Sequence, residues 1–473
     1  MIFSSNIFLY LFLPLVLGLY FISSQFLNIR NYILLFFSLV FYSFGEINYL
    51  WLLGFCVLSN YFWGIFLEKK LSQKTSKKII IFLAISFNIG LLAFFKYSNF
   101  IVNNYNNIFN ANINFEPIIL PLGISFFTFH AISYLVDIYR NKCLAQRNFV
   151  KLALYICFFP QLIAGPIVRY NFIAKYLTKR KHFSYAIAFG IRIFIIGLAK
   201  KIIIANPMAE VADAIFNANI KDLNREIVML GIFCYSLQIY FDFSGYSDMA
   251  YGLARIFGFR FPKNFNYPYI ALSIKDFWRR WHISLSSWFR DYVYIPLGGN
   301  KVSFIRQYFN LILVFFLCGL WHGASWNFVI WGLFHGIFLV LERFYFYQKF
   351  LNFLPKIIQN FYMLLVVMIA WALFRSSDLS TALAFYKIIL FDNSNFSSLP
   401  HNILRMINSH YLQFSLALAL LSYHPYLKNY FVKLIRKYQN LKIIYDLILL
   451  FCLIFVLTRL SSQTYNPFIY FQF

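Results

Sequence analysis

Uncharged, apolar stretches of helical length recur along most of this chain. A backbone that lies in hydrocarbon must satisfy its own N–H and C=O groups, so each stretch predicts a membrane helix rather than a loop. The shorter stretches are expected to be tilted, re-entrant or interfacial. They cover approximately residues 7–29, 31–45, 47–67, 79–95, 117–136, 152–168, 183–199, 227–250, 307–341, 357–374, 406–427 and 443–458.

The segments between these stretches differ in charge. Five of them are rich in Lys and Arg, and because cytoplasmic loops carry an excess of these residues, we expect all five to be cytoplasmic. The basic segments are 69–78, 140–151, 175–181, 255–306 and 428–442. With 152–168 counted as a re-entrant hairpin, this assignment puts both chain termini outside.

Composition supports a membrane protein. Of 473 residues, 61% are hydrophobic and only 12% are charged, which is more apolar surface than a soluble domain can bury. The net charge of +26 would suggest a nucleic-acid partner in a soluble protein. Here the basic residues lie in short loops between apolar spans, so we expect no nucleic-acid partner.

A histidine stands inside one of the apolar stretches. His322 lies in the run LCGLWHGASW, where Gly319, Gly323 and Ala324 allow the backbone to break or to approach a ligand closely. Ionisable groups at membrane depth are costly and are therefore candidates for function. A neutral imidazole has a pKa near working pH, so His322 is a candidate general base. A hydrogen-bonded core histidine is the alternative, which residue type alone favours, but the Gly and Trp surroundings favour catalysis.

The segment 273–300 is too charged to span a membrane and too aromatic to be a free loop. Its alternating cations and aromatic rings suit a helix that lies in the headgroup plane. It is either an anchor or a cytoplasmic mouth that binds an anionic acyl donor, with His282 facing inward. We favour the mouth, in which the donor-binding residues are Lys275, Arg279, Arg280, Trp281 and Arg290.

Other polar residues in apolar surroundings are expected to be structural. Asp137, Asp242 and Asp248 suit pairing with Arg or Lys. Five histidines, at 182, 335, 401, 410 and 424, belong to no constellation and are expected to be incidental. The chain has no nucleotide-binding loop, no metalloprotease motif and no nucleophile elbow, so we expect no metal.

Five segments together resemble the membrane-bound O-acyltransferase family, in the branch of the alginate O-acetylation, peptidoglycan O-acetylation and D-alanyl transfer proteins. They occur in the family's order over most of the chain. The matching segments are 121–140, 158–170 (FFPQLIAGPIVRY), 240–269, 276–300 and 319–336 (GLWHGASWNFVIWGLFHG).

This resemblance implies an all-α, polytopic fold. The family arranges about 11 transmembrane helices, with re-entrant and interfacial helices, in a ring around a central funnel. We divide the chain into N-terminal helices (1–115), a catalytic core (116–345) and C-terminal helices with an extracytoplasmic aromatic motif (346–473). His322 matches the histidine that is essential for transfer in the family, and His282 matches its second polar residue.

The chain ends with the residues PFIYFQF. They resemble a short aromatic motif that, in the D-alanylation system, ends a separate subunit whose tyrosine is thought to receive the acyl group. Tyr470 is then an acyl relay, since a phenolate with a pKa near 10 leaves more easily than a sugar alkoxide. The alternative is an aromatic anchor at the membrane interface.

The resemblance implies an O-acetyltransferase of the bacterial inner membrane. It would move an acetyl group from cytoplasmic acetyl-CoA to an extracytoplasmic polysaccharide, through a periplasmic partner transferase of the SGNH type. We favour peptidoglycan as the acceptor, with alginate or another exopolysaccharide as the alternative. The rivals from other classes are a proton-coupled transporter and a non-catalytic scaffold.

Overall fold

The computed structural model describes residues 1–69, 74–391, 401–438, 440–462 and 465–468, and these residues form helices and no strands. The chain divides into two compact units. The first contains Met1–Phe194 and Ser247–Pro262, and the second contains Ile195–Tyr246 and Lys263–Phe473. Two helices, α9 (Ser184–Ala199) and α11 (Arg225–Ile256), contribute to both units.

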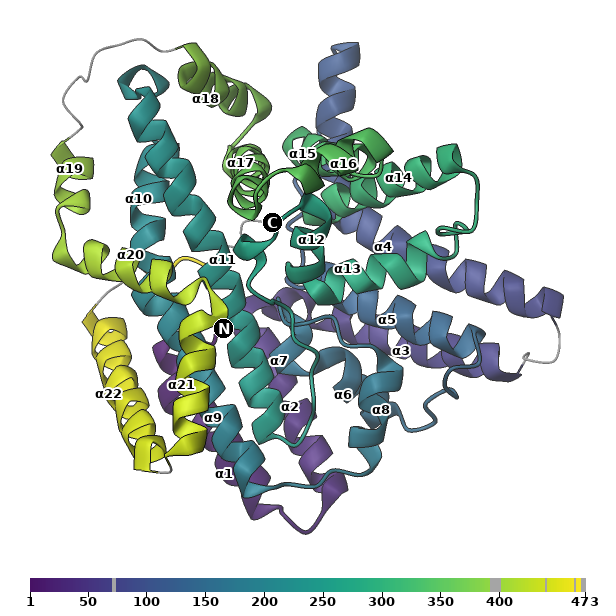
Figure 1. Ribbon diagram of the computed structural model, residues 1–473. Coiled ribbons are helices and arrows are strands. Elements are labelled where there is room, and N and C mark those ends of the chain that lie inside the picture. The colour runs from purple at the N-terminus through teal and green to yellow at the C-terminus, as the bar shows by residue number, and fades with distance from the viewer. Residues whose placement is uncertain (70–73, 392–400, 439, 463–464, 469–473) are drawn as a thin grey trace. The chain divides into compact units, whose positions relative to one another are not determined.

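The first unit is a helical bundle in which α3 packs on α4 and α5, and α2 packs on α6 (Figure 1). Its helices are α1 (Leu13–Ile22, preceded by the π-helix η1, Phe8–Phe12), α2 (Leu27–Glu46), η2 (Ile47–Tyr49), α3 (Leu50–Lys69), α4 (Lys74–Phe109), α5 (Ile124–Tyr139), α6 (Phe149–Cys157), α7 (Phe159–Leu162) and α8 (Tyr170–Thr178).

The second unit contains the remaining helices. They are η3 (Lys200–Ala205), α10 (Asn206–Phe216), η4 (Ile220–Asp222), η5 (Pro268–Ile270), α12 (Ile274–Arg280), α13 (Ile283–Phe289), η6 (Arg290–Tyr294), α14 (Phe304–His322), α15 (Trp326–Leu341), α16 (Tyr345–Phe353), α17 (Lys356–Arg375), α18 (Leu379–Phe391), α19 (His401–Ile407), α20 (His410–Ser422), α21 (Pro425–Lys437) and α22 (Asn440–Ser462).

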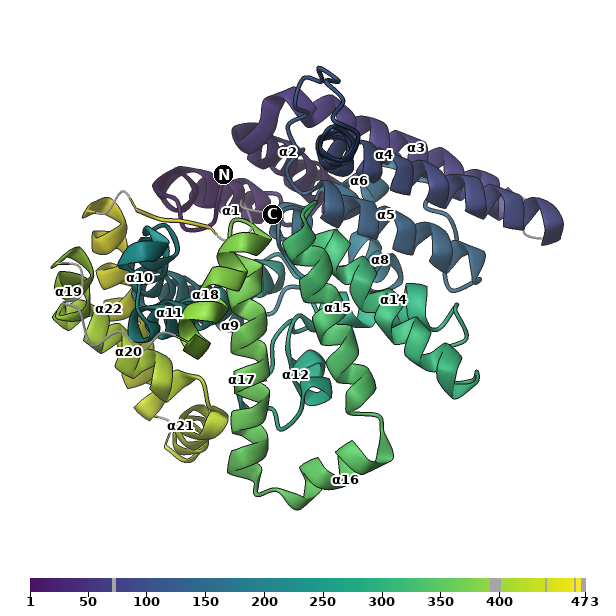
Figure 2. The ribbon, with the colours of Figure 1, turned by 90° about the horizontal axis from the view of Figure 1, so that it is seen from above.

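The described residues confirm a multi-pass membrane protein. Six helical stretches are long and apolar enough to cross a bilayer, and α15 with α16 forms a seventh that is bent by 83° (Figure 2). Four shorter apolar helices accompany them, so the total of about 11 crossings stays a prediction. The six stretches are Leu27–Lys69, Thr75–Phe109, Arg225–Ile256, Phe304–His322, Lys356–Arg375 and Asn440–Ser462. The domain boundaries expected from the sequence also stay a prediction.

The segment 152–168 does not form one continuous helix. Helix α6 ends at Cys157, α7 is a single turn, and every residue from 152 to 168 is buried within the first unit. The chain folds back so tightly that a Cβ at Gly165 would lie 2.3 Å from the carbonyl oxygen of Pro160. A broken, buried segment of this kind is consistent with the re-entrant hairpin that the sequence predicts.

Helices α14 and α15 form a close antiparallel hairpin, which Figure 2 shows from above. Two glycines permit the close approach. A Cβ at Gly319 would lie 2.2 Å from the carbonyl oxygen of Phe328, and a Cβ at Gly332 would lie 2.3 Å from that of Phe315. Because both obstacles are backbone atoms, a side chain at either position would push the helices apart. Small residues at such interfaces are a common feature of membrane helix pairs.

We expect Gly319→Ala to lower the free energy of unfolding by about 1–3 kcal/mol, the usual cost of overpacking. Gly54→Ala is the matched control, because a Cβ at Gly54 meets no atom within 4 Å. Thermal unfolding of the purified protein in detergent measures both changes. An equal effect of the two substitutions would contradict the role of Gly319.

Candidate active site

His322 lies at the break between the two helices of the hairpin. Helix α14 ends at this residue, and Gly323 continues in extended conformation before α15 begins. A Cβ at Gly323 would lie 2.2 Å from the ring of Phe328, so glycine makes room for that ring beside the helix end. The break predicted from the Gly-rich sequence is therefore present, and it leaves His322 only 7% exposed.

Aromatic rings surround the His322 imidazole. Its centroid is 4.9 Å from the ring of Trp331 and 5.1 Å from that of Phe374, and both rings stand nearly perpendicular to it. The ring of Trp321 is 4.8 Å away. Such surroundings keep bulk water from the imidazole and strengthen any electrostatic interaction made there.

His282 is the second buried imidazole, and it also lies at a helix break. It has left-handed backbone dihedrals (φ 42°, ψ 55°) between α12 and α13, and it is 0% exposed. Its ring is 6.0 Å from that of Trp321. Trp321 therefore contacts both imidazoles, and the structure brings together the two histidines that the sequence singled out.

Asn264 fixes the tautomer of His282. Its Oδ1 accepts hydrogen bonds from the backbone N–H of Ser284 (3.1 Å) and from the Ser284 hydroxyl (2.9 Å), which identifies this atom as the oxygen. His282 Nδ1 lies 3.1 Å from the same oxygen and must therefore donate a proton to it. In a neutral ring the proton is then on Nδ1, and Nε2 carries a free lone pair.

No residue in the described part of the chain hydrogen-bonds to Nε2 of His282. Burial lowers the pKa of His282 to about 3, so the ring is neutral at physiological pH. A buried, neutral imidazole with an unpartnered lone pair can accept a hydrogen bond from a hydroxyl group. The sequence did not identify Asn264, because nothing local relates it to a histidine 18 positions later.

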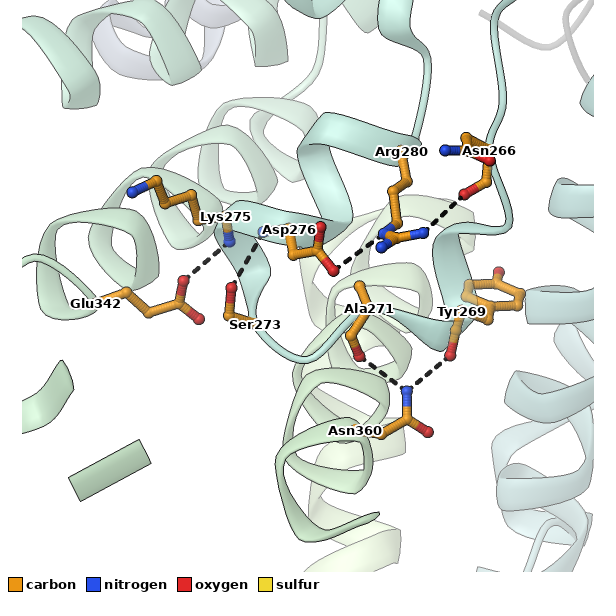
Figure 3. Close-up of polar contacts among 9 residues, drawn as sticks. All are labelled: Asn266, Tyr269, Ala271, Ser273, Lys275, Asp276, Arg280, Glu342 and Asn360. Carbon is orange, nitrogen blue, oxygen red and sulfur yellow. Dashed lines mark hydrogen bonds and ion pairs between the residues drawn. The ribbon is translucent and has the colours of Figure 1, made fainter. Parts of the chain in front are cut away.

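The segment 273–300 departs from the single interfacial helix that the sequence predicts. It consists of α12, α13 and η6, because the left-handed residue His282 interrupts the helix. Hydrogen bonds from other elements hold α12 in place (Figure 3). Glu342 accepts the backbone N–H groups of Ile274 (2.6 Å) and Lys275 (2.9 Å), and the Asn360 amide donates to two carbonyl groups just before α12.

The five residues expected to bind the donor differ in their surroundings. Lys275, Arg279 and Arg290 are exposed, and Arg290 forms an ion pair with Asp291. The other cation, Arg280, forms an ion pair with Asp276 within α12 (Figure 3).

Trp281 is the buried member of this set, and its ring stacks on that of Phe277 at 5.5 Å. Donor binding by these residues stays a prediction.

Comparison with known proteins identifies the family. Residues 34–377 match the membrane-bound O-acyltransferase family. This chain belongs to that family. A similar protein is a probable alginate O-acetylase of Azotobacter vinelandii. It is 43% identical to this chain over 82% of this chain and 77% of its own length.

Two further relatives are similar over most of their lengths. A probable alginate O-acetylase of Pseudomonas putida is 37% identical over 100% of both chains. A peptidoglycan O-acetyltransferase of Helicobacter pylori is 39% identical over 82% of this chain and 79% of its own length. The present chain is therefore an acyltransferase with a multi-pass membrane fold.

Near the C-terminus of this acyltransferase, the described residues 465–468 contact other elements of the second unit. Lys201 Nζ donates to the carbonyl oxygen of Pro467, and it also pairs with Asp242 at 3.0 Å, with both side chains almost completely buried. The ring of Phe468 lies 4.9 Å from that of Tyr246 on α11. The pairing expected for Asp242 is confirmed, and its partner is Lys201.

A second contact anchors the same segment. The Tyr465 hydroxyl donates to Asp213, which also forms an ion pair with Arg375 at 2.6 Å. Tyr470 lies outside the described residues. Among the described residues, no group of three or more His, Cys, Asp or Glu side chains has the arrangement of a metal site.

The depressed pKa of His282 predicts a pH dependence of stability. An unfolded histidine gains a proton below about pH 6.5, whereas the folded ring stays neutral until about pH 3. The unfolded state therefore binds more protons in this window. His282 lowers the free energy of unfolding by about 1.4 kcal/mol for each pH unit below 6.5. We expect the thermal unfolding midpoint of His282→Gln to fall less steeply than that of the wild type between pH 7.5 and 5.5.

The exposed His410 supplies the control for this experiment, since His410→Gln should retain the wild-type slope. Parallel pH profiles for wild type and His282→Gln would show that His282 is charged in the fold.

Proposed function

We propose that this acyltransferase moves an acetyl group from cytoplasmic acetyl-CoA across the bacterial inner membrane for O-acetylation of an extracytoplasmic polysaccharide. The observation that carries the proposal is the pair of buried imidazoles at two helix breaks, with Trp321 in contact with both. The similarity to alginate and peptidoglycan O-acetylating enzymes supports the acetyl group and the polysaccharide.

In the proposed reaction, the acceptor hydroxyl attacks the carbonyl carbon of the thioester. A C–O ester bond forms while the C–S bond breaks, and the hydroxyl proton passes through His322 to the departing thiolate, which leaves as the free thiol of coenzyme A. The lone pair on His282 Nε2 accepts a hydrogen bond that orients the acyl donor or the acceptor hydroxyl. Lys275, Arg279, Arg280, Trp281 and Arg290 form the cytoplasmic mouth that binds the donor.

The proposed first acceptor is the phenol of Tyr470. Phe468 contacts Tyr246, and His282 contacts Phe243 at 4.7 Å between ring centroids. Because Phe243 and Tyr246 are three residues apart on α11, they lie on one face of that helix. Phe468 therefore lies on the face of α11 that His282 also contacts, and this position of the described residue nearest Tyr470 in the sequence supports Tyr470 as the acceptor.

A separate periplasmic transferase of the SGNH type would then move the acetyl group from the tyrosyl ester to the polymer. We take peptidoglycan as the polymer, because every walled bacterium makes it and few make alginate. Analysis of ester-linked acetate on both polymers, in cells with and without the gene, distinguishes the two acceptors.

We expect His322→Gln to reduce acetyl transfer from radiolabelled acetyl-CoA by about 100-fold or more, the usual contribution of a general base. His410→Gln is the matched control and should retain wild-type activity. Full transfer by a folded His322→Gln protein would contradict the enzymatic role of His322. Proton transport by the wild type without consumption of acetyl-CoA would favour a transporter.

We expect Tyr470→Phe to abolish covalent labelling of the protein by radiolabelled acetyl-CoA, and hydroxylamine to remove the label from the wild type. Tyr430→Phe, at an exposed position on α21, is the control. Undiminished labelling of Tyr470→Phe would refute the relay and leave the acyltransferase reaction in place.

A further inference from the structure

A basic cavity of about 360 Å³ lies in the first unit, where the end of α8, the start of α9 and the chain after α11 meet. Several of its lining residues are cationic, and none is acidic. The cationic residues are Lys175, Lys179, Lys181, Arg255 and Arg260. We call this site the basic cavity.

The positive charge of the basic cavity is not neutralised by the protein. No carboxylate in the described part of the chain lies within ion-pair distance of the five cations. Arg255 instead donates to the hydroxyl group of Tyr251 (3.2 Å), and the Lys175 ammonium lies 5.1 Å from the ring of Tyr176. Like charges that share a concave, low-dielectric site attract and concentrate anions.

Further positive charge lies next to the lining of the basic cavity. His182 lines the cavity, and its Nδ1 lies 3.0 Å from the guanidinium of Arg30, which can only donate. Burial, followed by the charges of Arg30 and Arg180, lowers the pKa of His182 to about 4. His182 is therefore neutral at physiological pH, and the cavity keeps its lysine and arginine charges without a titrating group.

Arg180 lies next to this lining. Its guanidinium is 4.4 Å from the centroid of Phe259, a cavity-lining ring, and 5.8 Å from that of Tyr20. His182 was expected from the sequence to be incidental. Of the two arginines near it, Arg30 is distant in the chain and Arg180 is one of several cations in a basic loop.

The edge of the basic cavity is apolar. Phe183 and Tyr185 line it, are 45% and 68% exposed, and stack on each other at 5.4 Å. Phe189 follows one turn after Tyr185 on the same face of α9 and is 40% exposed. A cationic hollow that continues into exposed aromatic surface matches a ligand with an anionic head and a hydrocarbon tail.

We propose that the basic cavity binds the phosphate of an anionic phospholipid headgroup, with the acyl chains along the exposed face of α9. The expected cytoplasmic position of the loop 175–181 agrees with this ligand, because the cytoplasmic leaflet carries anionic lipids. The site uses none of the residues proposed for donor binding or catalysis. It is therefore independent of the acetyl-transfer proposal.

The test is lipid binding by the purified full-length protein in nanodiscs and by native mass spectrometry. The lipids are phosphatidylcholine alone and phosphatidylcholine with phosphatidylglycerol. We expect the wild type to retain phosphatidylglycerol selectively. The triple variant Lys179→Gln, Lys181→Gln, Arg260→Gln should bind it about tenfold more weakly or worse, since each headgroup-facing cation contributes appreciably.

The matched control removes the same charge elsewhere. Lys433→Gln, Lys437→Gln, Lys442→Gln alters exposed residues of α21 and α22 and should retain wild-type binding. An equal loss in this control would overturn the proposal in favour of non-specific attraction. Displacement of phosphatidylglycerol by inorganic pyrophosphate or free coenzyme A at similar concentrations would overturn the lipid assignment and identify a soluble phosphate ligand. Acetyl transfer, measured on the same samples, separates this outcome from failure of the catalytic proposal.

Discussion

Hydrocarbon provides no hydrogen-bond partner, so a polar group that this chain places among its apolar helices is costly unless it finds a partner within the protein. Several polar groups of the second unit meet where helices are interrupted, and side chains replace the missing partners there. Asn264 accepts the first N–H groups near α13, and Glu342 does the same for α12. The two candidate histidines lie at these interruptions, where backbone and side-chain polarity occur together.

The same constraint explains the buried ion pair of Lys201 and Asp242. Two opposite charges that are shielded from water are tolerable only as a pair with further hydrogen bonds, and Pro467 supplies one through its carbonyl oxygen. The pair thereby binds the described residues 465–468 through Pro467. A buried charged contact thus fixes the position of this short part of the chain.

Much of the fold followed from the sequence, because long uncharged stretches leave few alternatives to membrane helices. The interruption within 152–168 and the break at His322 were also predictable, since glycine and proline in apolar surroundings interrupt helices. The break at His282 was not, because it depends on left-handed dihedrals at a residue that does not require them. The sequence also did not reveal the roles of three further residues, Asn264, Glu342 and Lys201, for a related reason. Each acts on a residue 18 or more positions away, and hydrophobic patterning carries no information about such pairings.

Glu342 has a consequence for how the site responds to perturbation. Its carboxylate joins the end of α15 to the start of α12, while His322 is the last residue of α14, the partner helix of α15, and His282 lies between α12 and α13. The helices next to the two imidazoles are therefore linked to each other through Glu342. Random mutagenesis should therefore find that substitutions of Glu342 reduce activity, although its side chain contacts the backbone of α12 and neither histidine.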